Sequence, residues 1–153
     1  MVKKIKNYLG RDSKRKRRED QLSGKDRSKL MSRIKSKNTL FEKNFVKALK
    51  NATPIKFSTN VAEIKGKPDI VFRKQRVCVF LDSDFWHGWQ FPRVKHLLKN
   101  EFWRNKIESN RLRDGATTQY LRRHGWFVLR IWEHSIKQDS QREVKKVLKH
   151  LGL

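Results

Sequence analysis

Two short apolar runs, separated by only four polar residues, constrain the fold of this chain more than any other feature. Residues 69–72 and 77–81 are rich in the β-branched and aromatic residues that strands favour, and residues 73–76 form a polar turn. Strands joined so tightly pair antiparallel as a hairpin. The chain therefore contains a sheet that its other elements must cover.

Helical patterns occur on both sides of this hairpin. Thr39 and Glu42 form a T-x-x-E capping box, and apolar residues then recur at helical spacing, so we expect a helix that ends near Asn51. The further predicted elements are a short extended stretch at 55–57, a long helix at 100–124 closed by Gly125, a buried strand at 126–132 and a basic helix at 140–151. This order predicts an α/β domain with a mixed central sheet flanked by helices.

The charge of the chain indicates its partner. Lys and Arg number 39 and Asp and Glu 15, which gives a formal net charge of +24. Cationic side chains gain affinity for nucleic acid by releasing its condensed counterions, so a polyanion, above all nucleic acid, is the expected partner. An anionic membrane surface is the rival hypothesis, although no stretch pairs its basic face with a strongly apolar one.

Much of this charge lies at the N-terminus. Residues 1–30 are too polar to offset the entropy of ordering, so we expect a basic, disordered arm; a solvated helix or a targeting run is the alternative. Residues 31–153 would form the single folded domain, with order beginning near Ser32. The single cysteine, Cys78, lies in an apolar run and is expected to be a buried, inert thiol. With no apolar segment long enough for a membrane span and no signal peptide, we expect an intracellular protein of the cytoplasm and nucleoid, and a monomer.

Acidic residues lie at both ends of the hairpin. Asp69 opens the first strand, and residues 82–88, Asp-Ser-Asp-Phe-Trp-His-Gly, follow the second. A hairpin brings the start of one strand beside the end of the next, where Asp69 would meet carbonyls and side chains of residues 81–84. Phosphodiester hydrolysis uses a divalent cation, and hard cations prefer such oxygen ligands. A Pro-Asp pair that merely opens a strand is the structural alternative for Asp69.

Three further features lie near this position. His87 suits proton transfer because an imidazole exchanges protons near neutral pH, but a lone histidine is as often structural. Phe85 and Trp86, with Trp103, either pack in the core or are exposed and stack on bases. Asp114 lies on an otherwise apolar stripe of the long helix, where it either faces a site or pairs with a surface arginine.

The order of these motifs resembles the very short patch repair (Vsr) DNA mismatch endonucleases. The resemblance covers about residues 32–134 in unbroken order and rests on specific motifs. They are Met-Ser-Arg-Ile at 31–34, Asn-Thr-Leu-Phe-Glu at 38–42, Lys-Pro-Asp at 67–69, Phe-Trp-His-Gly at 85–88, Phe-Trp-x-x-Lys-Ile at 102–107, Asn-x-x-x-Asp at 110–114, and Gly-Trp at 125–126 with Trp-Glu at 132–133. The basic arm is not part of the match.

The resemblance implies a restriction-endonuclease-like core of the PD-(D/E)XK superfamily. It also implies that the partner is double-stranded DNA, which the enzyme nicks beside a thymine mispaired with guanine. It assigns Asp69 to metal binding, Leu81 to a metal ligand through its backbone carbonyl, and His87 to catalysis. Glu42 matches a glutamate near the metal, with the capping box as its competing role, and Asp114 matches a supporting acid near the histidine. The residues expected to bind DNA are Phe85, Trp86, Trp103, Arg33 and Lys67.

The chain departs from the best-known members at their structural zinc. Those members use cysteines and histidines where this chain has Asp84, Trp89, Phe91 and His134, so we expect Mg²⁺ or Mn²⁺ as the only metal cofactor and no structural zinc. The rebuilt loop leaves mismatch preference as the least constrained property. The alternatives are a restriction-type or defence-associated nuclease without that preference and a catalytically silent DNA-binding protein.

Overall fold

The computed structural model describes residues 39–97 and 101–153. The predicted basic arm at residues 1–30, the onset of order near Ser32 and the DNA-binding residue Arg33 lie outside these ranges. The fold below is that of the unit from residue 38 onward.

Within the described residues, four strands form one sheet in the order β1-β2-β3-β4. They are β1 (Ser58–Thr59), β2 (Ile70–Phe72), β3 (Val77–Asp82) and β4 (Phe127–Trp132). β2 pairs antiparallel with β1 and with β3, where Val71 lies opposite Cys78. β4 runs parallel to β3, with Leu81 opposite Ile131. The predicted hairpin and the mixed sheet are both confirmed.

Helices flank the sheet. They are α3 (Leu40–Ala52), α4 (Phe91–Val94) with a 3-10 turn at Lys95–Leu97, α5 (Glu101–Arg123), α6 (Glu133–Gln138) and α7 (Ser140–His150). The sequence patterns predict α3, α5 and α7 but not the short helices α4 and α6. The predicted extended stretch at 55–57 is wrong by a few residues, because β1 begins at Ser58.

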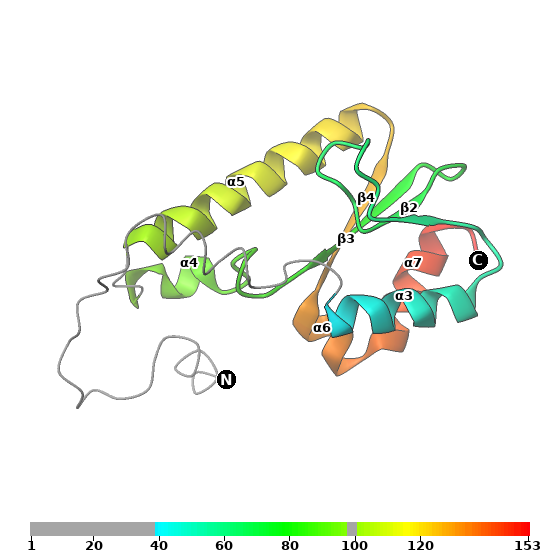
Figure 1. The fold of residues 1–153 in the computed structure, drawn as a ribbon, viewed down its shortest axis with the longest axis horizontal. Helices are drawn as coiled ribbons and strands as arrows, with labels where there is room; N and C mark the ends of the chain where they lie inside the picture. Colours follow the sequence, from blue (N-terminus) through cyan, green and yellow to red (C-terminus); the bar gives the residue numbers. More distant parts are fainter. Residues whose placement is uncertain (1–38, 98–100) are drawn as a thin grey trace. The chain divides into compact units, whose positions relative to one another are not determined.

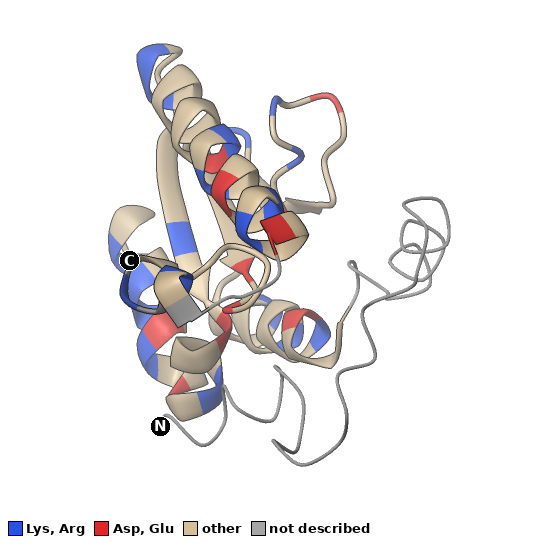
Figure 2. Cartoon of the chain, turned by 90° about the vertical axis from the view of Figure 1, so that its left-hand side faces the viewer, with Lys and Arg blue, Asp and Glu red and all other residues tan. Residues whose placement is uncertain are grey.

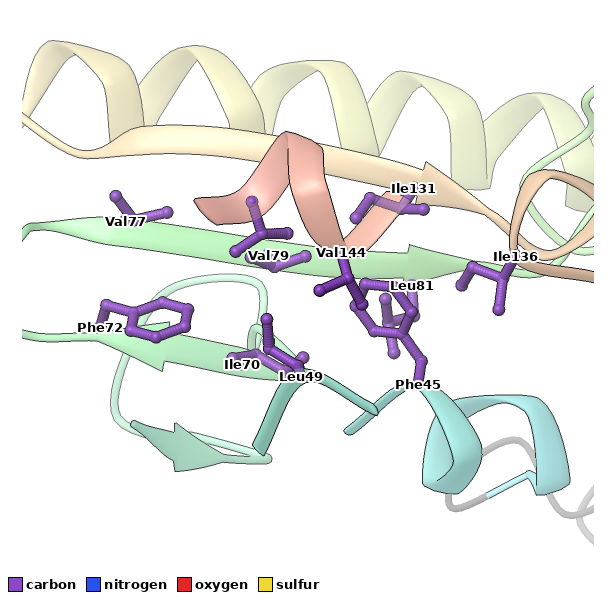
Figure 3. Packing of buried hydrophobic residues seen from close by; sticks show 11 residues of the cluster. Phe45, Leu49, Ile70, Phe72, Val77, Val79, Leu81, Ile131, Ile136 and Val144 are labelled. Carbon is purple, nitrogen blue, oxygen red and sulfur yellow. The ribbon is translucent and has the colours of Figure 1, made fainter. Parts of the chain in front are cut away.

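The sheet separates two apolar clusters. Residues that alternate along β3 face opposite sides: Val79 packs with Phe45 of α3 and Val144 of α7, and Phe80 packs with Leu121 of α5. Figure 3 shows the first cluster between β3 and α3, and Figure 1 shows α5 on one side of the sheet with α3, α6 and α7 on the other. Every residue of β3 is buried, as expected for a strand covered on both faces.

Two local predictions, one for Gly125 and one for Cys78, are confirmed by the structure. Gly125 closes the long helix with φ +76°, a left-handed conformation that suits glycine. Cys78 is fully buried, and burial raises the pKa of its thiol to about 11, so it stays protonated and inert. No helix in the part of the chain that the structure describes is long and apolar enough to cross a membrane.

Candidate functional site

Asp69 lies where the hairpin brings the start of β2 beside the end of β3. Its Oδ2 accepts a hydrogen bond from the backbone N–H of Leu81 at 2.8 Å, and its backbone carbonyl accepts one from Asn60 at 2.9 Å. The predicted meeting of Asp69 with residues 81–84 is therefore present. The hydrogen bond to Leu81 also fixes the rotamer of the carboxylate, so the Pro-Asp pair has a structural role as well.

The surroundings of Asp69 oppose its negative charge. Burial raises the pKa of this carboxyl to about 6; the N–H of Leu81 and the nearby His87 lower it, and the carboxylates of Glu42 and Asp82 raise it. No Lys, Arg or His among the described residues forms a salt bridge with it. Glu42 also accepts the backbone N–H of Thr39 at 3.2 Å. Both roles considered for Glu42, helix capping and proximity to Asp69, are thus present together.

His87 and Asp114 form the closest polar contact of the site. The Nδ1 atom of His87 lies 2.6 Å from Oδ2 of Asp114. Burial alone would raise the pKa of Asp114, but the hydrogen bond with His87 and the charge of Arg130 outweigh it and lower that pKa. An ionised carboxylate only accepts hydrogen bonds, so Nδ1 carries a proton in this contact, and in a neutral ring the lone pair would lie on Nε2. Two roles were considered for Asp114: facing a site or pairing with a surface arginine. It contacts both His87 and an arginine, but that arginine is the partly buried Arg130.

Sequence reasoning missed Arg130, and it gave Asp82, a member of the 82–88 motif, no partner. Arg130 of β4 forks onto both oxygens of Asp82, from Nε to Oδ2 and from Nη2 to Oδ1, each at 2.6 Å. The same Nη2 lies 3.3 Å from Oδ2 of Asp114. Burial lowers the pKa of Arg130, but Asp82 and Asp114 outweigh it and raise that pKa. A signal was available, since Arg130 interrupts the otherwise apolar strand β4 and Asp82 is the one charged residue of β3, at its end.

The loop that carries His87 is fastened to α5. Asn110 donates to the carbonyl of Trp86 at 3.0 Å, and Arg111 donates to the carbonyl of Gly88 at 2.7 Å. Gly88 has φ +65°, and a Cβ there would lie 2.6 Å from the side chain of Ile107. Only glycine allows the loop to approach the helix so closely. Polar side chains of α5 and the close packing at Gly88 therefore hold the backbone on either side of His87.

The predicted DNA-binding aromatics form one cluster. The rings of Phe85, Trp86 and Trp103 lie 5.1 to 5.7 Å apart in tilted and edge-on pairs, and each residue is half-buried. They are neither core residues nor freely exposed. Phe102 extends the cluster to the surface, with 38% of its area exposed. Lys67 is exposed and lies two positions before Asp69.

Four residues of this chain stand where the best-known Vsr endonucleases are expected to bind a structural zinc, and three of the four contact one another. His134, at the start of α6, contacts Asp84 in the loop, with Nδ1 2.6 Å from Oδ1. The ring of Trp89 packs against that of His134 at 4.5 Å, and Phe91 is buried beside Ile107 and Phe85. A hydrogen bond and aromatic contacts thus join the loop to the helix that follows β4.

The surroundings of the site bear on which ligands it can bind. Among residues 39–97 and 101–153, no three His, Cys, Asp or Glu side chains are grouped closely enough to hold a metal ion by themselves. A hollow of about 670 Å³ opens beside Asp114 and Arg130, lined also by Gly115, Thr118, Gln119, Arg122 and Arg123. Figure 2 shows Lys and Arg, with some Asp and Glu among them, along both the long helix and the C-terminal helices.

Comparisons with known proteins identify the family. The family model for DNA mismatch endonuclease Vsr matches residues 19–93. A type II nicking enzyme of Neisseria meningitidis serogroup C is 38% identical over 130 residues, which span 84% of this chain and 87% of that protein. The chain belongs to the Vsr family. A type II nicking enzyme of Haemophilus parainfluenzae is 31% identical over 84% of this chain and 95% of its own length. The DNA mismatch endonuclease Vsr of Escherichia coli is 32% identical over 72% of this chain and 71% of its own length.

Membership of the Vsr family confirms the resemblance and settles the class of activity. The bounds of the match differ, because the family model begins at residue 19, inside the arm that the sequence motifs left out. The chain is a DNA endonuclease, a hydrolase of phosphodiester bonds that acts in repair or restriction, and DNA is its substrate. The comparisons thereby favour an endonuclease over the catalytically silent DNA-binding protein. The cluster of Asp69, His87 and Asp114 is the natural candidate for its catalytic centre.

Proposed function

We propose that this chain is a magnesium-dependent endonuclease, built on a restriction-endonuclease-like core, that nicks duplex DNA beside a thymine mispaired with guanine. The observation that carries the proposal is the convergence of two side chains. Asp69 is a half-buried carboxylate without a salt-bridge partner in the described part of the chain, and His87 has its Nδ1 held by Asp114, so that Nε2 is available for proton transfer. The product would carry a 5′ phosphate and a 3′ hydroxyl. We further propose that the protein acts inside the cell as a monomer.

The residues around Asp69 fit a hard divalent cation. The carboxylate is crowded by other carboxylates and lacks a salt-bridge partner in the described part of the chain, so a cation would relieve the cost of its charge. Asp69 and the carbonyl of Leu81 would hold Mg²⁺ or Mn²⁺, with phosphate oxygens and water completing the shell as Mg²⁺ prefers. When bound, the cation would neutralise charge on the phosphate and make water a stronger nucleophile. Glu42 would add negative charge on the same side.

His87 would move the proton. Asp114 holds Nδ1, which orients the ring and leaves Nε2 free to accept a proton from the attacking water. The ionised Asp114 would then stabilise the imidazolium that forms. Asn110 and Arg111 fix the loop backbone, so the ring keeps its position as DNA binds.

The aromatic cluster would read the duplex. Phe85, Trp86 and Trp103 lie on the loop and helix beside His87, and half-buried rings of this kind can wedge between base steps. Lys67 and Arg33 would contact phosphates, which position DNA without reading its sequence. The contact between Asp84 and His134 would take the place of a structural zinc in holding the loop.

A second function keeps the same chemistry with a different target. Several of the relatives carry the name type II nicking enzyme, which favours an origin in restriction. On that hypothesis the enzyme would cut perfectly paired DNA as well as mismatched DNA.

One experiment separates these functions. Matched and G·T-mismatched duplexes of one sequence are incubated with wild-type or Asp69→Ala protein, with Mg²⁺ or with a chelator. We expect wild-type protein to nick the mismatched duplex faster, and only with Mg²⁺, and the variant to bind DNA without cutting it. Equal rates on both duplexes would favour the restriction-type function, and cutting by Asp69→Ala would overturn the proposed metal site.

A further inference from the structure

Arg130 lies at the centre of the charged cluster behind His87. Its guanidinium binds both oxygens of Asp82, lies 3.3 Å from Oδ2 of Asp114 and stacks over the ring of Phe80, 4.9 Å from its centroid. A planar fork bound at two points keeps its orientation, unlike a lysine on a flexible stem. Arg130 thus connects the end of β3 to α5 through side chains.

Two carboxylates lie within reach of the same imidazole nitrogen. Nδ1 of His87 is 2.6 Å from Oδ2 of Asp114 and 3.6 Å from Oδ1 of Asp82. Asp82 is almost completely buried, at 2% exposure, so without a cationic partner its charge would have to be satisfied by other donors. If Arg130 were absent, the Nδ1–H group of His87, 3.6 Å from Oδ1, would be the donor next in reach of Asp82.

We propose that Arg130 is a positioning residue that occupies Asp82 and thereby assigns His87 to Asp114. By binding both oxygens of Asp82, the guanidinium leaves Asp114 as the acceptor for the Nδ1–H of His87. The imidazole ring then has one orientation instead of two, and its Nε2 always points in the same direction. This inference rests on the proposed role of His87 in proton transfer and adds the residue that fixes its geometry.

The charge balance around His87 gives the inference a measurable consequence. The charged groups that face it are Asp82 from β3, Asp114 from α5 and Arg130 from β4, and Asp69 lies near enough to interact electrostatically. In their ionised forms these groups sum to three negative charges and one positive charge. Removing the positive one exposes the imidazole to an uncompensated carboxylate, which favours its doubly protonated form.

Two other roles for Arg130 are conceivable. It lines the hollow of about 670 Å³ beside Arg122 and Arg123, from which it would contact a DNA phosphate directly. Alternatively, it only neutralises Asp82 so that the strands pack. A phosphate contact would alter KM, and a purely structural role would alter unfolding but not the pH profile of the folded enzyme.

The experiment compares three variants by steady-state nicking across pH. They are Arg130→Met, the double variant Arg130→Met with Asp82→Asn, and the control Arg142→Met. The control makes the same change beside another buried carboxylate, Glu143 on α7, on the opposite side of the sheet. ¹⁵N NMR of the His87 ring, recorded without DNA and without metal, follows its protonation independently of activity. Thermal unfolding shows which variants are folded.

We expect Arg130→Met to lower kcat by about 10- to 100-fold with little change in KM, since outer-shell partners have effects of this size. The acid limb of its kcat profile, and the protonation of the His87 ring by NMR, should move to higher pH by about one unit. The double variant, which lacks the competing carboxylate, should recover most of kcat and the wild-type limb. Arg142→Met should match wild type in both.

Three results would overturn the inference. A rise in KM at constant kcat would make Arg130 a phosphate contact, and a wild-type pH profile in folded Arg130→Met would make it structural. If Arg130→Met does not fold, the double variant alone decides: an acid limb of its kcat profile that differs from that of wild type would contradict the inference. Failure of the proposed function is read separately, because cutting by Asp69→Ala would leave the NMR result for His87 unchanged.

Discussion

The molecule contains two histidine–carboxylate pairs that share one distance and differ in their surroundings. In each, Nδ1 lies 2.6 Å from a carboxylate oxygen, for His87 with Asp114 and for His134 with Asp84. The first pair is more buried and has the guanidinium of Arg130 behind it. The second is about one-third exposed, and the ring of Trp89 packs against it. The same hydrogen bond therefore joins one histidine to a cluster of charged residues, where we propose that it transfers a proton, and joins the other to a residue of the loop.

The largest expected difference between the pairs is in the rate of nicking. His87→Gln should lower kcat by about 100-fold or more, because proton transfer by a positioned side chain contributes that much. His134→Gln should lower kcat by less than about threefold, because a partly exposed pair contributes little. Single-turnover nicking of a mismatched duplex with Mg²⁺ measures both. A loss of similar size in the two variants would show that the loop pair also belongs to the catalytic machinery.

The two regions should respond with opposite signs when a carboxylate loses its charge. Asp69 has a folded-state pKa of about 6, above its ordinary value of 3.8, so its ionisation destabilises the fold as pH rises from about 4 to 6. Asp69→Asn should therefore stabilise the metal-free protein by up to about 3 kcal/mol above pH 6 and by nothing below pH 4. Asp84→Asn should destabilise it at neutral pH by about 0.5 to 1 kcal/mol.

Urea unfolding in the presence of a chelator, at several pH values, measures both effects. Added Mg²⁺ should narrow the gap between wild type and Asp69→Asn, since a cation held by that carboxylate stabilises only the wild-type fold. A gap that does not change with pH would contradict the proposed electrostatic cost at Asp69.

The smallest expected effect concerns the ring that packs on the second pair. Trp89→Leu should lower the melting temperature by about 3 °C, since it removes an aromatic contact worth roughly 1 kcal/mol from a residue that is 45% exposed. Its kcat should stay within about twofold of wild type. The check is a thermal melt beside the nicking assay, and a large loss of activity without a loss of stability would place Trp89 on the DNA.

Local patterns predicted much of the fold. The hairpin, the helices α3, α5 and α7 and strand β4 follow from periodicity, capping and turn chemistry, which act over a few residues. The short helices α4 and α6 were not predicted, because they have one or two turns and no repeating apolar face. Packing against the sheet stabilises such helices, and a local pattern does not record it.

The site divides in the same way. The motif around residues 82–88 indicated His87, and the start of β2 indicated Asp69, since each lies in a recognisable local context. Arg130 and its pairing with Asp82 were missed because the two residues are 48 positions apart in the sequence and neither one alone indicates the pair. The parallel register of β3 and β4, which places Asp82 beside Trp132 and Phe80 beside Arg130, brings them together.

The sequence by itself determined that a basic chain would build a hairpin with Asp69 at its start and His87 just beyond its end. Only the tertiary structure decided which carboxylate each histidine binds. His87 pairs with Asp114, 27 residues away, rather than with Asp84, three positions before it, and Asp84 pairs with His134, 50 residues away. The reason is that helix packing and strand register set the direction of each side chain, and both are long-range properties of the fold.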